Sequence, residues 1–253
     1  MSRKSAVIWA QCAVVILSIL AVEISCRTGA IDNRTLISPS DMAVKLKDRL
    51  LSGEMNDDIL QTFATVGTSF LLAVVIGFLA GIIIHAIPRL RRALDPLLAS
   101  YYSIPFFVFY PLLIAFFGLN KLPLIVIGFV FAAAAMVLST LNGLDRVPRS
   151  LLKTARMMRL GRVQTVRLIT FPAAAPYLFT GLKLSLAYAF IGVIAGEFIL
   201  SGGGLGYSIA YAYNNFDNDT MYATMLFVLI VATAMNGILH AWEQRLLRRR
   251  GRP

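Results

Sequence analysis

Long apolar stretches alternate with short polar segments along the whole chain. A helix that crosses a membrane needs about 20 mostly apolar residues, and the sequence contains six stretches of roughly that length. They span residues 6–25, 59–87, 97–117, 123–141, 173–198 and 221–242. The pattern therefore predicts an all-α integral membrane protein with about six transmembrane helices.

Composition supports this class. Hydrophobic residues make up 58% of the chain and charged residues 15%, against about 45–50% and about 25% in soluble domains. The formal net charge of +11 is concentrated in short blocks between apolar stretches, so we expect no binding to nucleic acid. Cys12 and Cys26 form no CxxC or metal-ligand pattern.

The distribution of cations predicts the orientation. With the N-terminus inside and six alternating spans, inside segments hold seventeen of the 24 Lys and Arg residues, and outside segments hold six. Because cytoplasmic loops carry an excess of Lys and Arg, we predict that both termini are cytoplasmic. The predicted parts are a first helix with a polar outer segment (1–58), a five-helix core (59–245) and a basic cytoplasmic tail (246–253).

The N-terminal part leaves two alternatives open. Stretch 6–25 follows two cations, as in a signal peptide, but it is long and no small-x-small cleavage site follows it. We favour an uncleaved helix. In the outer segment, Ser38-Pro39-Ser40-Asp41 predicts the start of a short amphipathic helix capped by Ser40 or Asp41. A solvated tether is the alternative.

The longest polar interruption in the C-terminal half is segment 143–172. It carries seven cations and one acid, Asp145. Cationic and apolar residues alternate there at helical spacing. The cationic face holds Arg149, Lys153 and Arg156, and the apolar face holds Leu151, Ala155 and Met158. We interpret the segment as a cytoplasmic helix that docks on a partner; the alternative is a basic loop that only orients the protein.

The same segment is predicted to bend twice. Leu160-Gly161 interrupts the helical pattern, which indicates a corner between two short helices. Pro172 precedes the next apolar stretch and predicts a break there.

Stretch 97–117 is rich in aromatic residues and contains Pro105 and Pro111. Proline kinks or breaks helices, and irregular backbone within a membrane is tolerated where it lines a cavity. We therefore predict a kinked helix that lines a translocation path with Phe106 and Phe109. An aromatic belt at the membrane interface is the alternative.

Stretch 173–198 contains two ionisable residues, Lys183 and Glu197. Charges inside a bilayer are costly and indicate function, so both are candidates for the translocation path. They lie about 21 Å apart on one helix face and cannot pair with each other. Alternatively, snorkelling or a neighbouring helix satisfies each. The glycine-rich sequence that follows, 202–207, is not GxGxxG and predicts a flexible outer turn.

Signatures of catalysis are missing from the sequence. It contains no GxxxxGK[ST], no GxSxG and no HExxH. His85 and His240 lie near predicted inner helix ends without an evident partner. We therefore expect no enzyme activity and no metal or cofactor bound by this chain.

Six short motifs lie in and beside the apolar stretches: Ser103-Ile104-Pro105, Pro111-Leu112, Phe117-Gly118-Leu119, Gly181-Leu182-Lys183, Ala195-Gly196-Glu197 and Gly204-Leu205-Gly206-Tyr207. With these motifs, roughly residues 35–245 resemble the permease subunits of bacterial ATP-binding-cassette importers. The resemblance is to the branch of the family that handles nitrate, sulfonates, taurine and pyrimidine precursors. In segment 143–172, Lys153-Thr154-Ala155 stands at the family's Glu-Ala-Ala-like triplet, and Pro172 stands at its closing proline.

Two positions depart from the family pattern. Lys153 replaces the acid of the triplet, and Arg159 stands where the family usually has glycine, with Gly161 the nearest glycine. We predict that this basic helix meets an acidic groove on its partner.

The resemblance implies a permease that forms the path of a small solute across the bacterial inner membrane. Implied partners are a cytoplasmic ATPase dimer that binds ATP and Mg, a second permease subunit in a homodimer, an extracytoplasmic solute-binding protein and the lipid bilayer. ATPase coupling would involve Leu151, Lys153, Thr154, Ala155, Arg156, Met158, Arg159, Leu160, Gly161 and Pro172. Pro105, Phe106, Phe109 and Glu197 would line the path, and Gly204, Gly206 and Tyr207 its outer mouth.

The sequence is also compatible with two other classes of membrane protein. An ion-coupled secondary transporter should show acids near the bilayer middle and repeated halves with interrupted helices, and the sequence shows no convincing repeat. A membrane scaffold without transport activity is the second alternative.

Overall fold

The computed structural model describes residues 3–32 and 35–249, and every regular element within them is helical. The α-helices are α1 (Arg3–Arg27), α2 (Pro39–Ser52), α3 (Asn56–Ala86), α4 (Pro88–Ser100), α5 (Tyr110–Phe117), α6 (Leu122–Asp145), α7 (Arg149–Met157), α8 (Arg162–Thr165), α9 (Phe171–Leu200), α10 (Leu205–Asn214) and α11 (Asn218–Arg249). Two short 3-10 turns, η1 (Tyr101–Ser103) and η2 (Phe106–Phe109), and a π-helical turn, η3 (Val166–Thr170), complete the set.

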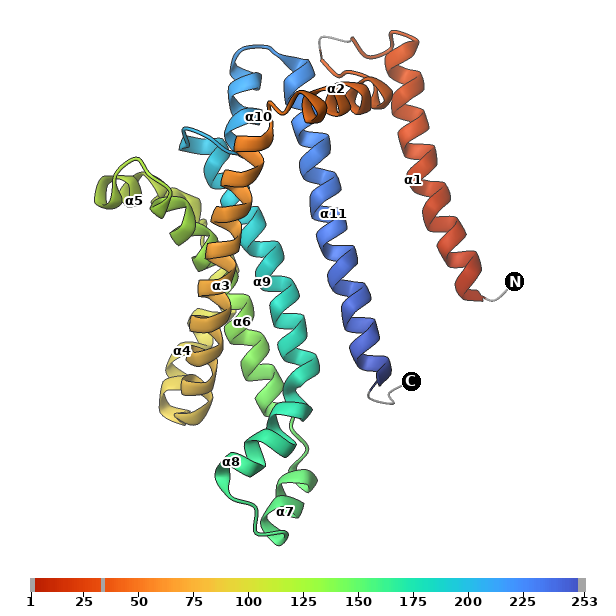
Figure 1. Cartoon of the computed structure of the whole chain (residues 1–253). Coiled ribbons are helices and arrows are strands. Elements are labelled where there is room, and N and C mark those ends of the chain that lie inside the picture. Colours follow the sequence, from red (N-terminus) through yellow and green to blue (C-terminus); the bar gives the residue numbers. More distant parts are fainter. Residues whose placement is uncertain (1–2, 33–34, 250–253) are drawn as a thin grey trace.

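Five helical segments of the described residues are long and apolar enough to cross a membrane. They are Trp9–Arg27, Asn56–Ala86, Leu122–Asp145, Arg162–Ile199 and Asn218–Gln244. Figure 1 shows α3, α6, α9 and α11 running along one common direction, with α1 at the edge. The predicted all-α membrane class is confirmed, and five of the six predicted stretches are long helices.

The remaining predicted stretch, 97–117, is broken. α4 ends at Ser100, the turns η1 and η2 follow, and α5 begins only at Tyr110. Pro105 causes the break, because proline pushes the preceding residue out of the helical conformation, and Ile104 has φ −84° and ψ 119°. The prediction of a single kinked helix here is therefore wrong.

The core of the bundle consists of α6 packed between α3 and α9. Small residues allow the close approach: a Cβ added to Gly81 of α3 would lie 2.7 Å from the Cβ of Thr140 on α6. On the other side, a Cβ added to Gly128 of α6 would lie 2.8 Å from Val193 of α9. Such small-residue contacts are typical of helix pairs in membranes.

Helix α2 crosses the end of the bundle between α1 and α11 (Figure 1). Its cap is Ser38, whose hydroxyl accepts a hydrogen bond of 3.2 Å from the N–H of Asp41. The predicted caps, Ser40 and Asp41, are therefore wrong, because Pro39 occupies the first helical position, where no N–H is needed. Lys45 forms a 2.5 Å ion pair with Asp219 of α11, and the hydrogen bond to Asp219 raises the pKa of Lys45.

Segment 143–172 forms α7, a corner and α8. The corner is where Leu160-Gly161 predicts it, since Gly161 is the N-cap of α8. The break predicted at Pro172 is wrong: α8, the π turn and α9 form one helical run through this proline. The π turn ends at Thr170, two residues before Pro172. It contains Leu168, whose carbonyl a proline at position 172 cannot bond and would clash with in a regular α-helix, so the wider turn accommodates the proline.

Different segments gather at the two ends of the bundle. In Figure 1, the start of α1, helices α4, α7 and α8 and the end of α11 lie toward one end, and α2 and α10 lie toward the other. The first end is the predicted cytoplasmic side. Helix α11 extends to Arg249, and the rest of the predicted basic tail, 250–253, lies outside the described residues.

Candidate functional site

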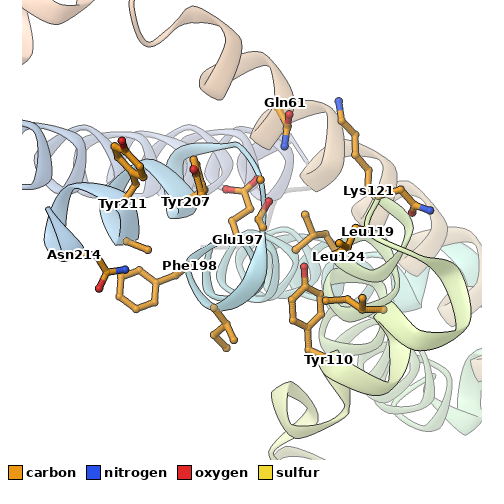
Figure 2. Close-up of a pocket in the computed structure, with 16 residues that line it drawn as sticks. Gln61, Tyr110, Leu119, Lys121, Leu124, Glu197, Phe198, Tyr207, Tyr211 and Asn214 are labelled. Carbon is orange, nitrogen blue, oxygen red and sulfur yellow. The ribbon is translucent and has the colours of Figure 1, made fainter.

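A cavity of about 600 Å³ lies near the predicted outer end of the bundle. Figure 2 shows Tyr207 and Tyr211 on one side and Tyr110 on the other, with Glu197 between them. Polar lining also comes from Gln61, Asn120, Lys121 and Asn214, and apolar lining from Ile114, Leu119, Leu124 and Phe198. A mostly apolar wall with a few amide, phenol and ammonium groups suits a small polar solute.

Glu197 borders this cavity, and its side chain is completely buried. Thr62 Oγ1 of α3 is 2.9 and 2.8 Å from its two carboxylate oxygens, and the N–H of Gly206 donates to Oε2 at 3.0 Å. The same Thr62 oxygen accepts a 2.9 Å hydrogen bond from the N–H of Leu205. A buried carboxylate is costly without such donors, so Glu197 and Thr62 together fix the turn before α10.

The glycine-rich turn is packed tightly against this carboxylate. Gly204 has φ +99°, and a Cβ added there would lie 2.4 Å from the carboxylate carbon of Glu197. A Cβ on Gly206 would lie 2.3 Å from the carbonyl oxygen of Ile194. The N–H of Gly204 also donates to Asp58 at 2.9 Å. The prediction of a flexible turn is therefore wrong: only glycine fits at positions where turn and helix approach this closely.

At the opposite end, α7 and α8 project beyond the bundle (Figure 1). Of the predicted apolar face, Ala155 is buried, but Leu151 is 42% and Met158 66% exposed. Met157 and Val163 are 85% and 80% exposed. The cationic side chains Lys153, Arg156 and Arg159 are exposed as well. A surface with both large apolar and cationic side chains is typical of a protein interaction site.

The corner between α7 and α8 contains a strained residue. Arg159 has φ 51°, the left-handed region that glycine favours. It is the position where the resembling family usually has glycine. The sequence departure therefore coincides with a backbone conformation that suits glycine better than arginine.

Arg159→Gly is expected to stabilise the chain by about 0.5–1 kcal/mol, because relief of the left-handed strain exceeds the entropy cost of glycine. Thermal unfolding of the purified chain in detergent measures the effect. Arg156→Gly is the matched control: it also removes one charge but lies in helix α7, where glycine costs about 1 kcal/mol. If Arg159→Gly unfolds at a lower temperature than wild type, the backbone at Arg159 is not strained.

Residues 73–252 match the protein family described as "Binding-protein-dependent transport system inner membrane component".

The chain belongs to this family. The matched range covers the described helices from the middle of α3 onward, including segment 143–172, α11 and every lining residue of the outer cavity except Gln61. Together with the five long apolar helices, membership identifies a multi-pass membrane protein of a transport system.

The chain is also similar to curated proteins of known name. The chain is 26% identical over 181 residues to the nitrate import permease protein NrtB of Leptolyngbya laminosa, which covers 72% of the chain and 65% of that protein. It is 26% identical over 220 residues to the putative aliphatic sulfonates transport permease protein SsuC of Bacillus subtilis, covering 87% of the chain and 80% of that protein. The resemblance found in the sequence motifs is thus confirmed.

The fold also matches a solved structure. A chain of the MetNI methionine ABC transporter in an inward-facing conformation superimposes with a TM-score of 0.60 and 23% identity. The match covers 76% of this chain and 94% of that chain. The shared fold is that of an ABC transporter permease.

The path residues predicted from the sequence are only partly brought together. Glu197 and Tyr207 border the outer cavity. Phe106 instead packs against Phe131 of α6 with ring centroids 5.8 Å apart, and Phe109 is 47% exposed. Neither these two nor Pro105 are among the residues that line the cavity. Their role in the path stays a prediction.

Lys183 forms an ion pair with a neighbouring helix, which was the alternative to a role in the translocation path. Its ammonium group lies 2.7 Å from the carboxylate of Glu243 on α11, and both side chains are about four-fifths buried (23% and 19% exposed). Phe179 and Trp242 form an edge-to-face contact beside the pair, with ring centroids 5.1 Å apart. The pair therefore joins α9 and α11 toward the predicted inner side.

Lys183→Met is expected to destabilise the chain by about 1–3 kcal/mol, because Glu243 is left in a largely buried place without its cation. Replacing both partners, Lys183→Met with Glu243→Met, should bring stability back to within about 1 kcal/mol of wild type. Thermal unfolding of the three proteins measures the difference. Equal destabilisation by the single and double variants would show that the pair itself contributes nothing.

The two histidines do have partners, contrary to the expectation from the sequence. His85 Nε2 lies 3.3 Å from Asp145 and His240 Nδ1 lies 3.7 Å from Glu243. Within residues 3–32 and 35–249, no cluster of His, Cys, Asp and Glu could hold a metal ion. Sequence reasoning missed Thr62 as the partner of Glu197; its only signal was a row of Thr and Ser residues in an otherwise apolar helix.

Proposed function

We propose that this chain is the membrane-spanning permease subunit of an ATP-binding-cassette importer. It forms the path of a small solute and is coupled by segment 143–172 to cytoplasmic ATPase subunits, which bind ATP and Mg. Movement of the ATPases would switch the path between inward-facing and outward-facing states, by alternating access. The membrane would be the inner membrane of a bacterium.

One observation carries the coupling proposal. Segment 143–172 projects from the predicted cytoplasmic end (Figure 1) and presents Leu151, Met157 and Met158 together with exposed cations. Large apolar side chains in this position are left without cover by the described part of the chain. A cavity of about 310 Å³ beside Leu151, lined also by Leu168 and Pro172, adds a concave surface. An ATPase with an acidic groove would complement both features.

The relatives support a solute class. NrtB is named for nitrate, SsuC for aliphatic sulfonates, and the protein CmpB of Synechococcus elongatus, 29% identical over 194 residues, for bicarbonate. All three solutes are small and carry oxyanion groups. The outer cavity has room for such a solute, and Lys121, Gln61 and the tyrosines supply hydrogen-bond donors. We propose a small oxyanion that an extracytoplasmic binding protein delivers to this cavity.

A second permease subunit completes the proposed complex, since one chain provides only one wall of a path through the membrane. We propose a homodimer. An ion-coupled secondary transporter is less well supported, because the intramembrane ionisable residues Glu197 and Lys183 are engaged by Thr62 and Glu243 within the chain.

Site-directed crosslinking tests the coupling proposal. Met158→Cys is co-expressed with the ATP-binding-cassette ATPase encoded beside this gene, and the membranes are treated with a thiol-to-amine crosslinker. We expect a crosslinked product of permease and ATPase that changes with ATP. Tyr211→Cys, exposed at the opposite end of the bundle, is the matched control and should give none. Crosslinking from position 211 but not from 158 would reverse the proposed orientation and overturn the coupling proposal.

A further inference from the structure

An ionic cluster lies where α3, α4 and α6 meet at the predicted cytoplasmic end. Arg91 of α4 donates two hydrogen bonds to the two carboxylate oxygens of Asp145, at 2.7 and 2.6 Å. His85 of α3 approaches the same carboxylate at 3.3 Å, and Asp95 lies 3.7 Å from the Nε of Arg91. A two-pronged arginine–carboxylate pair fixes direction as well as distance.

Asp145 lies where the bundle joins the segment that contains α7. Asp145 is the last residue of α6, and α7 begins four residues later at Arg149. It is also the only acid in segment 143–172. A movement of α7 relative to the bundle therefore reaches the end of α6 through only three connecting residues, 146–148, and Arg91 is attached at that end.

Helix α4 leads from this cluster to the broken aromatic segment. Leu90, Leu94 and Leu98, spaced one turn apart, pack on the buried residues Ile84, Val137 and Leu141 of α3 and α6. An apolar stripe holds two helices together but allows them to slide or rotate, whereas a bidentate ion pair fixes their register. Arg91 thus sets the position of α4 along α6.

Beyond α4 the chain contacts α6 again. The hydroxyl of Tyr101 donates to the carbonyl oxygen of Val130 at 2.5 Å, and Phe107 stacks on Phe131 with centroids 4.7 Å apart. Tyr110 and Ile114 of α5 then line the outer cavity. The segment from α4 to α5 is therefore attached to α6 at its start and near its middle, and its end forms part of the cavity wall.

We propose that Arg91 and Asp145 are positioning residues that pass the movement of α7 through α4 to the α5 wall of the outer cavity. This inference rests on the proposed coupling of segment 143–172 to an ATPase. Without the pair, the ATPase still binds and hydrolyses ATP, but the cavity no longer changes shape in response.

The distance across the cavity tests this directly. Spin labels are attached at Leu119→Cys and Asn214→Cys, two lining positions on opposite elements, in a chain with Cys12 and Cys26 replaced by alanine. The permease–ATPase complex is placed in lipid nanodiscs, and the label distance is measured by pulsed electron spin resonance with and without ATP and vanadate. ATP hydrolysis is measured on the same samples.

We expect Asp145→Asn to leave hydrolysis within about twofold of wild type but to abolish the ATP-driven change in label distance, since a register contact is lost and no ATP-binding group is touched. Arg92→Gln is the matched control. Arg92 lies next to Arg91 on α4 and carries the same charge, but its side chain donates to the carbonyl oxygen of Pro88, at 3.4 Å, within its own helix. It should keep the distance change.

The possible results separate the inference from the proposed function. A normal distance change in Asp145→Asn overturns the inference while leaving the proposed function intact. A wild-type complex with neither permease-dependent hydrolysis nor a distance change overturns the proposed function and the inference with it. If Asp145→Asn does not assemble, Arg91→Lys decides, because it keeps the charge but loses the two-pronged geometry: a normal distance change there overturns the inference.

Discussion

Gly206→Ala is expected to destabilise the chain by about 3 kcal/mol, at the upper end of what overpacking costs. The new methyl group would lie 2.3 Å from the carbonyl oxygen of Ile194 and 2.9 Å from the N–H nitrogen of Phe198. Both are backbone atoms of α9, so no side-chain rotation relieves the contact. We expect the unfolding temperature in detergent to fall by about 6–12 °C.

Gly202→Ala provides the control for this prediction. Gly202 lies in the same glycine-rich turn, and a Cβ added there meets nothing within 4 Å. Its unfolding temperature should stay within about 2 °C of wild type, as for most surface substitutions. If Gly202→Ala and Gly206→Ala unfold at the same temperature, the close packing of the turn on α9 is refuted.

Glu197→Ala is expected to cost about 2–4 kcal/mol, because the donors of Gly206 and Thr62 lose their acceptor in a place that solvent does not reach. Glu197→Gln should cost about 1 kcal/mol: the amide oxygen still accepts from the N–H of Gly206, and the amide NH2 donates to the hydroxyl of Thr62. Thermal unfolding of the two variants gives the comparison.

Glu197→Ala removes hydrogen bonds and also leaves a cavity. A double-mutant cycle with Thr62→Val separates the free energy of the Thr62–Glu197 hydrogen bonds from the cost of that cavity. Since both residues hold the same turn, the effects of Glu197→Ala and Thr62→Val should fall short of additivity by about 1 kcal/mol or more. Additive effects would mean that the two side chains act independently, and that the carboxylate does not fix the turn through Thr62.

The helices that the sequence predicted correctly follow from hydropathy, and the corner follows from its glycine. Five long helices and the corner at Leu160-Gly161 are where the sequence predicts them, because apolar length and glycine act locally. The break before Pro105 was predicted only as a kink. The helix through Pro172 was missed, because the π turn that accommodates it leaves no sequence pattern.

Partners across the bundle could not be predicted in the same way. Thr62 and Glu197 are 135 positions apart, and Lys183 and Glu243 are 60 positions apart. Which residues meet depends on how α3, α6, α9 and α11 are rotated against one another, and one sequence fixes those rotations only through the sum of many packing contacts. The sequence therefore identified Glu197 and Lys183 as unusual but left open what satisfies them.

We propose that segment 143–172 couples this chain to an ATPase. The most direct test measures ATP hydrolysis by the permease and its neighbouring ATPase in lipid nanodiscs, with and without the neighbouring binding protein. Met157→Asp with Met158→Asp places two charges on the exposed apolar surface of this segment. We expect the binding protein to stimulate hydrolysis in wild type and not in this variant, with the complex still assembled. Stimulation that persists in the variant, or no response in wild type, would contradict coupling through this segment.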